Sequence, residues 1–197
     1  MKLAALALAT MLSLVAAGPA PEKSKTMGNP TAPVRLDLYS DFTCPHCKMF
    51  HEQILPKLQS DYISPGKVYL VFHEYILTGP GHEHSRTASN YAAAAARIGK
   101  YQQVSDALFQ QQASWAMTGK VWETIAPVLT PAEQTKIQTL VKDPAVINEV
   151  QTDLNMGNSA RVDRTPTVII TRNGKQTPWS YWNDYNLFRS YLNDQLK

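Results

Sequence analysis

The stretch SDFTCPHCK, residues 40–48, decides the fold, because it places the only two cysteines where a predicted strand meets a predicted helix. Residues 34–39 (VRLDLY) before it alternate apolar and polar side chains, which predicts a strand. Pro45 suits the first turn of a helix, since its missing N–H would be unpaired there in any case. Apolar residues then recur every three or four positions from Cys47 to Leu58, which predicts one apolar helix face.

Two cysteines separated by two residues at a helix start favour thiol–disulfide exchange. Cys44 should face the unpaired N–H groups and the positive end of the helix dipole, which stabilise a thiolate and lower the pKa of the thiol. His46 adds positive charge or a hydrogen bond. We therefore expect Cys44 to be the nucleophile and Cys47, one turn further on, to be the resolving thiol. A stabilised thiolate makes the disulfide more oxidising, and a Pro45–His46 pair agrees with that direction.

The rest of the chain predicts an α/β fold with a helical insertion. Strands are expected at residues 67–75 and 167–171, and Asn-Gly at 173–174 marks a hairpin turn to a short partner strand. Residues 84–158 between these strands are mostly helical in pattern, and residues 183–196 predict a final amphipathic helix. Strands that flank a long helical block indicate a sheet domain interrupted by helices.

The first residues have the pattern of a secretory signal peptide over residues 1–17. A positive start (MK) precedes an apolar run over residues 3–15, and small residues follow at a suitable cleavage site. The run is short for a transmembrane helix. The alternative is an uncleaved N-terminal anchor. Cleavage after Ala17 would place the chain outside the cytoplasm, where disulfides persist. Residues 18–31, rich in Pro and small side chains, predict a tether.

Composition excludes several classes of protein. The chain has 197 residues, of which 44% are hydrophobic and 18% charged, so it can form a core of normal size. The formal net charge of +3 is not concentrated in a basic run, so nucleic acid is not expected as a partner. Two cysteines are too few for a disulfide-dense scaffold or a four-cysteine zinc site.

Four stretches make the chain similar to the DsbA-like thiol–disulfide oxidoreductases. They are GNPTAPV at 28–34, SDFTCPHCK at 40–48, LPKL at 55–58 and RTPT at 164–167. The resemblance runs from about residue 28 to the C-terminus. It implies a thioredoxin fold with an inserted helical domain.

The domain boundaries that follow from this resemblance divide the thioredoxin fold into two parts. The first part is expected over residues 32–78 and the second over 161–197. The helical insertion is expected between them, over residues 79–160.

The resemblance also implies a substrate-docking position at Thr165 and Pro166. The family has a cis-proline, preceded by Thr or Val, beside the active-site disulfide. The backbone N–H and C=O of Thr165 would then pair with a substrate strand. The alternative is an ordinary trans proline at a strand start. The family usually has Gly where this chain has Arg164, which would stabilise the Cys44 thiolate, contact an acidic substrate, or be a solvated surface residue.

A second departure concerns proton transfer. The family often has a buried Glu six residues before the nucleophile, and this chain has Leu38 there. Asp37 is adjacent, but neighbouring residues of a strand point to opposite faces. The sequence leaves open whether Asp37 acts through a bulge or whether another group or a water relays the proton.

The expected function is a secreted, periplasmic, monomeric enzyme that oxidises the thiols of protein substrates. The disulfide itself is the redox group, so no bound cofactor is expected, and the resemblance implies a membrane partner that resets the disulfide. A reductase or isomerase of the same fold is the alternative, because the direction of electron flow and the substrate are left open. An inert structural disulfide is disfavoured, since so short a loop constrains the unfolded chain little.

A metal carrier is the alternative from a different class of protein. Cys44, Cys47 and His51 have the spacing C-x2-C-x3-H, which suits metal ligands. Further ligands would come from other histidines, at positions 73, 82 and 84. A redox disulfide needs no metal at this site, and no metal is expected there.

Overall fold

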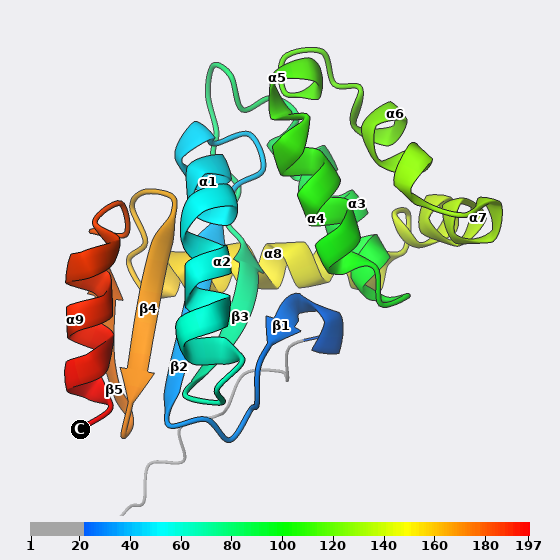
Figure 1. Cartoon of the computed structure of the whole chain (residues 1–197). Coiled ribbons are helices and arrows are strands. Elements are labelled where there is room, and N and C mark those ends of the chain that lie inside the picture. Colours follow the sequence, from blue (N-terminus) through cyan, green and yellow to red (C-terminus); the bar gives the residue numbers. More distant parts are fainter. Residues whose placement is uncertain (1–21) are drawn as a thin grey trace, which may run out of the picture.

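Five strands in the order β1-β3-β2-β4-β5 form one sheet in the computed structural model, which describes residues 22–197 (Figure 1). The central strand β2 (Val34–Ser40) is parallel to β3 (Val68–Glu74) and antiparallel to β4 (Thr167–Arg172). The edge strands β1 (Thr26–Met27) and β5 (Lys175–Trp179) are antiparallel to their neighbours. Every strand expected from the sequence is present close to its predicted bounds.

The helix that follows β2 is continuous but changes its winding. It begins with α1 (Pro45–Met49) and includes α2 (Leu55–Leu58). The segments Phe50–Ile54 and Gln59–Ile63 are wound more widely, as π-helix. Pro56 gives a reason for the first wide turn, because proline lacks an N–H and its ring clashes with the carbonyl four residues earlier in a regular α-helix.

The chain between β3 and β4 is helical, as predicted. Its α-helices are α3 (Ser85–Ala96), α4 (Tyr101–Gln110), α5 (Gln112–Trp115), α6 (Val121–Ile125), α7 (Pro131–Leu140) and α8 (Pro144–Ser159). Among the described residues, none of the helices is long and apolar enough to cross a membrane.

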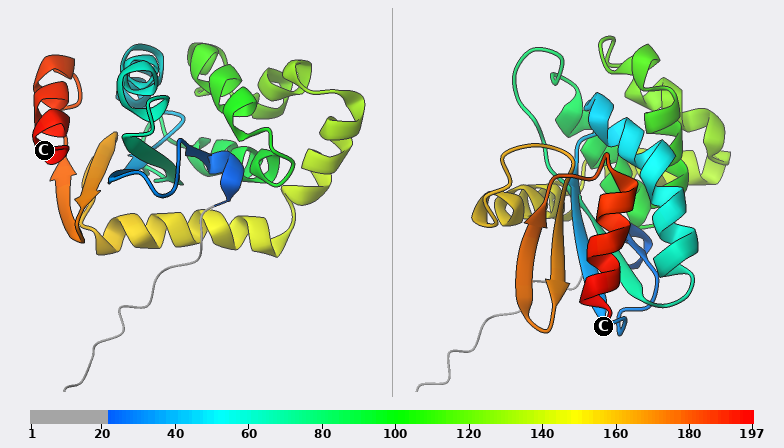
Figure 2. Two further views of the ribbon diagram at one scale, coloured as in Figure 1. Left: turned by 60° about the horizontal axis from the view of Figure 1, so that its bottom comes forward. Right: turned by 60° about the vertical axis from the view of Figure 1, so that its left-hand side comes forward.

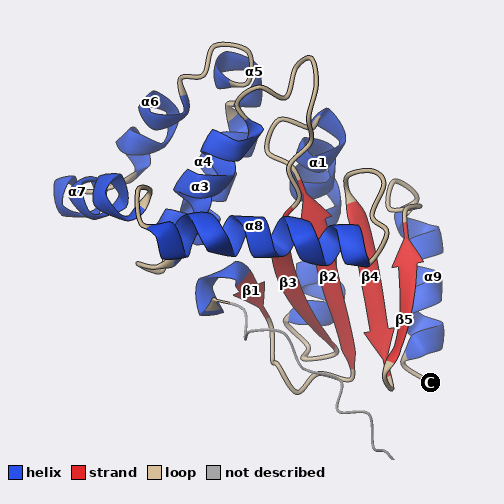
Figure 3. Ribbon diagram, turned by 180° about the vertical axis from the view of Figure 1, so that it is seen from behind, coloured by secondary structure: helices blue, strands red, loops and turns tan. Residues whose placement is uncertain are grey.

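The helices lie on both faces of the sheet (Figures 2 and 3). On one face, α8 runs across the strands, whereas α1, α2 and the C-terminal helix α9 (Tyr185–Gln195) cover the other. Helices α3 to α7 form a group beyond the β3 side (Figure 1). All of α3 to α8 lie within the predicted insertion 79–160, but α8 packs on β3 as well as on α3 and so also belongs to the sheet layer.

The predicted tether over residues 18–31 is wrong for its described part. From Glu22 onward the chain is folded, with a 3₁₀ turn (Lys23–Lys25) followed by β1, which pairs with β3. The Lys25 ammonium is buried against Asp153 of α8, with Nζ 2.5 Å from Oδ2. The composition of this segment, rich in Pro and small residues, does not predict a buried ion pair or a strand pairing. The predicted signal peptide over residues 1–17 lies outside the described residues.

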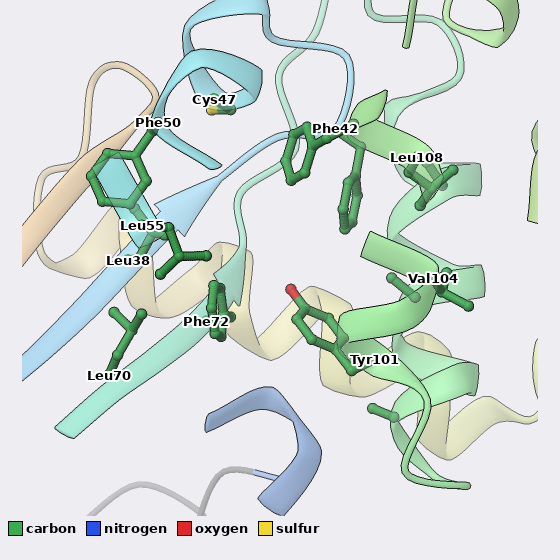
Figure 4. Packing of buried hydrophobic residues seen from close by; sticks show 14 of the residues in the cluster. Leu38, Phe42, Cys47, Phe50, Leu55, Leu70, Phe72, Tyr101, Val104 and Leu108 are labelled. Carbon is green, nitrogen blue, oxygen red and sulfur yellow. The ribbon is translucent and has the colours of Figure 1, made fainter. Parts of the chain in front are cut away.

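The main core lies between the sheet and the helix that carries the cysteines (Figure 4). Leu38 and Phe72 of the sheet, Phe50 of the helix and Cys47 belong to one buried cluster. Phe72 also meets Tyr101 of α4, with ring centroids 5.6 Å apart. Burial of one large apolar side chain contributes about 1.5–3 kcal/mol, so this core fixes the helix, and with it Cys47, against the sheet.

Candidate active site

The two cysteines lie at the start of α1, beside the end of the central strand. Cys44 is the N-cap residue of α1 and Cys47 lies in its first turn, as predicted. Both are free thiols in this structure and both are buried, Cys44 at 5% exposure and Cys47 at 1%. Pro45 and His46 between them are exposed. The motif therefore presents its intervening residues to solvent while the sulfur of Cys47 lies in the core.

The environment of Cys44 stabilises its thiolate. A hydrogen bond from the Cys47 thiol lowers the pKa of Cys44 to about 5, against the opposing effect of burial. Thr165 and the backbone N–H groups of Cys47 and His46 lower it further. These N–H groups belong to the first helical turn and have no partner within the helix, so the position at a helix start acts as the sequence predicts.

The environment of Cys47 has the opposite effect. Burial raises the pKa of Cys47 well above its ordinary value, and the neighbouring Cys44 raises it further. The backbone N–H of Asp41 donates to Cys47 Sγ over 3.4 Å and partly opposes this. Cys44, with its lowered pKa, and the more deeply buried Cys47, with its raised pKa, can therefore act as an attacking group and a resolving group.

Thr165 and Pro166 lie beside Cys44, although they follow it by more than a hundred residues. The Thr165–Pro166 peptide bond is cis. The Cys44 thiol donates to the Thr165 carbonyl, with Sγ 3.5 Å from the oxygen. Thr167 Oγ1 donates to the Arg164 carbonyl over 2.8 Å and so fixes the turn that leads into β4. The sequence-predicted neighbours of the cysteines are thus brought together at one place.

Arg164 lies at the surface beside this turn. Its guanidinium pairs with Asp163, with Nε 2.9 Å from Oδ1, and the side chains of both are mostly exposed. The Asp163 carboxylate raises the pKa of Arg164 further above its ordinary value. The structure thus places Arg164 at the surface, in an ion pair with its neighbour in sequence.

A buried carboxylate holds the loop before Cys44. Asp41 accepts hydrogen bonds from the Thr43 N–H (2.6 Å) and hydroxyl (2.5 Å), from the Leu77 N–H (2.7 Å) and from the Ser85 hydroxyl. Four donors satisfy a buried charge that would otherwise be costly. Asp41 belongs to the stretch SDFTCPHCK, but nothing in the sequence showed that its carboxylate is buried and holds this loop.

A second missed contact joins the active-site loop to the helical group. Gln112 Nε2 donates to the carbonyls of Phe42 (2.7 Å) and Cys44 (3.0 Å). Lys48 Nζ donates to the carbonyl of Phe109 over 2.8 Å. Gln112 and Phe109 lie more than sixty residues beyond their partners Cys44 and Lys48, so no local sequence pattern indicates these contacts.

Three of the four histidines considered as metal ligands have other partners. His73 donates to or accepts from Asp37 and Asp153, His51 contacts Asp106, and His82 contacts Thr43. Within residues 22–197, the structure forms no group of three or more His, Cys, Asp or Glu side chains arranged to hold a metal ion.

Asp37 lies on the face of the sheet under α8. Its carboxylate accepts from Arg35 Nη2 over 2.6 Å and contacts His73 Nε2 over 2.8 Å, and Asp153 of α8 contacts the other ring nitrogen of His73. Leu38 belongs to the core on the opposite face, with Cys47. The prediction that Asp37 points away from the cysteines is confirmed, and the strand forms no bulge that would turn it toward them.

Comparisons with known proteins agree with this arrangement. The chain matches a family model described as Thioredoxin over residues 21–188. It is 28% identical over 160 residues to a Rickettsia felis protein provisionally named a protein-disulfide oxidoreductase. The match covers 79% of this chain and 55% of that protein. It is 25% identical over 192 residues to disulfide bond formation protein D of Bacillus subtilis, covering 93% of this chain and 82% of that protein.

The chain spans between 55% and 64% of the length of the three Rickettsia relatives that it matches at 26–28% identity. Among solved structures, oxidised BdbD of Bacillus subtilis matches with a TM-score of 0.68 at 24% identity, covering 87% of this chain and 92% of that one. Alpha-DsbA1 of Wolbachia pipientis matches with a TM-score of 0.70 at 19% identity, covering 87% and 90%.

The likenesses to these structures confirm the predicted fold, a thioredoxin fold with a helical insertion. The family model covers most of the chain, and the relatives' names agree with the resemblance drawn from the motif. The chain therefore belongs to the thioredoxin family.

Proposed function

We propose that this protein oxidises the thiols of protein substrates by passing them the Cys44–Cys47 disulfide. The observation that carries the proposal is the contrast between the two thiols: the pKa of Cys44 is lowered to about 5, whereas that of buried Cys47 is raised. A stabilised Cys44 thiolate favours the reduced pair, so the disulfide is a stronger oxidant than one between ordinary thiols.

The exchange takes place in two steps. A substrate thiolate attacks Cys44 Sγ, the Cys44–Cys47 bond breaks, and Cys47 leaves as a thiolate that takes up a proton. A second substrate thiolate then attacks the substrate sulfur of the mixed disulfide, and Cys44 leaves as its stable thiolate. The substrate loses two electrons and gains a disulfide, and the enzyme gains both electrons as two reduced cysteines.

Substrate docking is assigned to Thr165 and Pro166. The Thr165 carbonyl lies 3.5 Å from Cys44 Sγ, so an extended substrate backbone paired there would bring its own cysteine to the attacked sulfur. His46 is exposed beside Cys44, with its ring 5.9 Å from that of Trp182, and is placed to meet the same substrate.

The setting that we propose is the periplasm, reached through the N-terminal signal peptide, with the protein acting as a monomer. A membrane protein that accepts electrons from the reduced pair would restore the disulfide after each turnover. The disulfide serves as the redox group without a further cofactor.

The test is the reduction potential of the pair, measured by equilibration with glutathione buffers, together with oxidation of a reduced dithiol peptide. An oxidase should lie near the potential of about −120 mV found for strong oxidants of this fold and should oxidise the peptide. A potential near about −270 mV would instead identify a reductase. Cys44→Ser should abolish the exchange; an active Cys44→Ser variant would overturn the assignment of the nucleophile.

A further inference from the structure

A small, mostly enclosed cavity in the core is lined by both Cys47 and Glu74. Its volume is about 10 Å³, and its lining includes Cys47, Glu74, Tyr101 and Ser105. This is the volume that one water molecule requires. Figure 4 shows Cys47 and Tyr101 on two different helices around this part of the core, with Phe72 of the sheet beside Tyr101.

Ser105 gives the cavity a polar group in need of a partner. It is 3% exposed, and its hydroxyl makes no hydrogen bond with any other residue of the described chain. A buried hydroxyl without a partner is costly, and a water bound by two to four polar groups satisfies it. The cavity therefore suits a water molecule that touches Ser105, Cys47 and Glu74 together.

Glu74 is the carboxylate on this cavity and it is held firmly. It is 1% exposed at the end of β3 and accepts a hydrogen bond from the Tyr101 hydroxyl over 2.8 Å. The Lys25 ammonium lies 3.8 Å from Oε1, and Asp153 of α8 lies on the other side of Lys25. The charged and titratable groups facing Glu74 are therefore Lys25, Asp153, Tyr101 and Cys47.

Two other titratable groups near Cys47 are less suited to exchange a proton with it. Asp41 already accepts four hydrogen bonds. His51 lines the same cavity, but its Nε2 lies 2.7 Å from Asp106 and its ring packs 4.7 Å from that of Phe109. Glu74, in contrast, lines the cavity, and the hydrogen bond from Tyr101 holds its carboxylate in one orientation.

We propose that Glu74 is the positioning residue that gives a proton to Cys47, through one water, when the disulfide opens, and takes it back when the disulfide closes. This inference rests on the proposed exchange reaction. When a substrate thiolate attacks Cys44, the S–S bond breaks and Cys47 becomes a thiolate. The Glu74 carboxylic acid passes its proton to the water, the water passes one to Cys47, and Glu74 becomes a carboxylate that regains a proton from solvent.

The charge state of Glu74 suits this task at neutral pH. Burial raises the pKa of Glu74 to about 7, while Lys25 opposes the rise. An acid with a pKa near the working pH both gives and accepts a proton readily. Without such a proton, Cys47 would have to leave as a buried thiolate. It is then a poor leaving group, because burial raises its pKa.

The experiment measures single-turnover reduction of the disulfide by a dithiol peptide between pH 5 and pH 9, corrected for the peptide thiolate. In the wild type, the corrected rate should fall above the Glu74 pKa of about 7. Glu74→Gln keeps the oxygen that accepts from Tyr101 but has no proton to give. It should lower the rate at pH 6 by about 10-fold or more and remove the inflection.

Glu149→Gln is the matched control. Glu149 also contacts Lys25, at 3.4 Å, but does not line the cavity, so its variant should keep the wild-type profile within about twofold. The inference is overturned if Glu74→Gln keeps the inflection, if both variants slow the reaction equally, or if His51→Asn and not Glu74→Gln removes the inflection. A wild type that exchanges no disulfide would instead overturn the proposed function.

A measurement on the wild type covers the case in which Glu74→Gln does not fold. The carboxyl ¹³C resonance of Glu74 is titrated in the oxidised and in the reduced protein. If the Glu74 proton is shared with Cys47, the midpoint must differ between the two redox states. Equal midpoints would overturn the inference.

Discussion

The hydrogen bond from the Cys47 thiol is the largest influence that lowers the pKa of Cys44 to about 5, and it can be removed selectively. Cys47→Ala deletes the donor, whereas Cys47→Ser replaces it with a hydroxyl donor of similar size. A hydrogen bond to a charged group contributes about 1.5–3 kcal/mol. Since each pKa unit is about 1.4 kcal/mol, Cys47→Ala should raise the pKa of Cys44 by about 1 to 2.

The assay follows the ultraviolet absorbance of the Cys44 thiolate against pH, together with the rate of its alkylation by iodoacetamide. Cys47→Ser should titrate close to the wild type. Cys47→Ala should stay below the ordinary thiol value, because the backbone N–H groups of Cys47 and His46 remain in place. If Cys47→Ala titrates with the wild type, the helix start alone sets this pKa and the reasoning is wrong. If Cys47→Ser rises as far as Cys47→Ala, a hydrogen-bond donor at this position is not what lowers the pKa, and the reasoning also fails.

The same pKa fixes how strongly the disulfide oxidises. At pH 7 the solution lies about two units above the Cys44 pKa of about 5, which stabilises the reduced pair by up to about 2.7 kcal/mol. Solvent screening of the thiolate reduces this to about 1.5–2.7 kcal/mol. With about 1.4 kcal/mol for each 30 mV, the potential should lie about 30–60 mV above that of a pair of ordinary thiols.

Three further predictions concern stability and the surface. Lys25→Met should lower the free energy of unfolding, measured in urea, by about 3–5 kcal/mol, because it leaves buried carboxylates unpaired. The control Lys23→Met changes an exposed lysine and should alter this free energy by less than about 0.5 kcal/mol. Equal effects of the two substitutions would contradict the burial argument. Since the pKa of Glu74 is raised from 4.5 to about 7, native Glu74 holds a proton that the unfolded chain has lost, so stability falls by about 3 kcal/mol from pH 4.5 to 7. Glu74→Gln should remove that part of the fall, and an unchanged pH profile would refute it. Arg164→Gly should change the pKa of Cys44 by less than about 0.3, and a larger rise in the same titration would restore Arg164 as a group that stabilises the thiolate.

Most strands and helices of the fold could be predicted from local sequence patterns. The alternation over residues 34–39, the Pro45 helix start and the Asn-Gly hairpin each depend on neighbours in sequence. The hairpin forms as expected, with φ values of 50° at Asn173 and 77° at Gly174. The tether prediction failed because β1 is only two residues long, and its pairing with β3 depends on residues more than forty positions away.

The sequence by itself located the cysteine pair at a helix start and placed Leu38 and Asp37 on opposite faces of the strand, since a helix start and a two-residue strand period are properties of short segments. Only the tertiary structure decided which groups surround those thiols. The family resemblance had placed Thr165 beside Cys44. Gln112 and Glu74 were not expected there, and they come from a helix and a strand far from the motif along the chain. A contact of this kind exists only when the sheet and both helical layers have packed, and no local periodicity encodes it. Burial acts in the same way, because the raised pKa of Glu74 comes from the elements that close around it rather than from its neighbours in sequence.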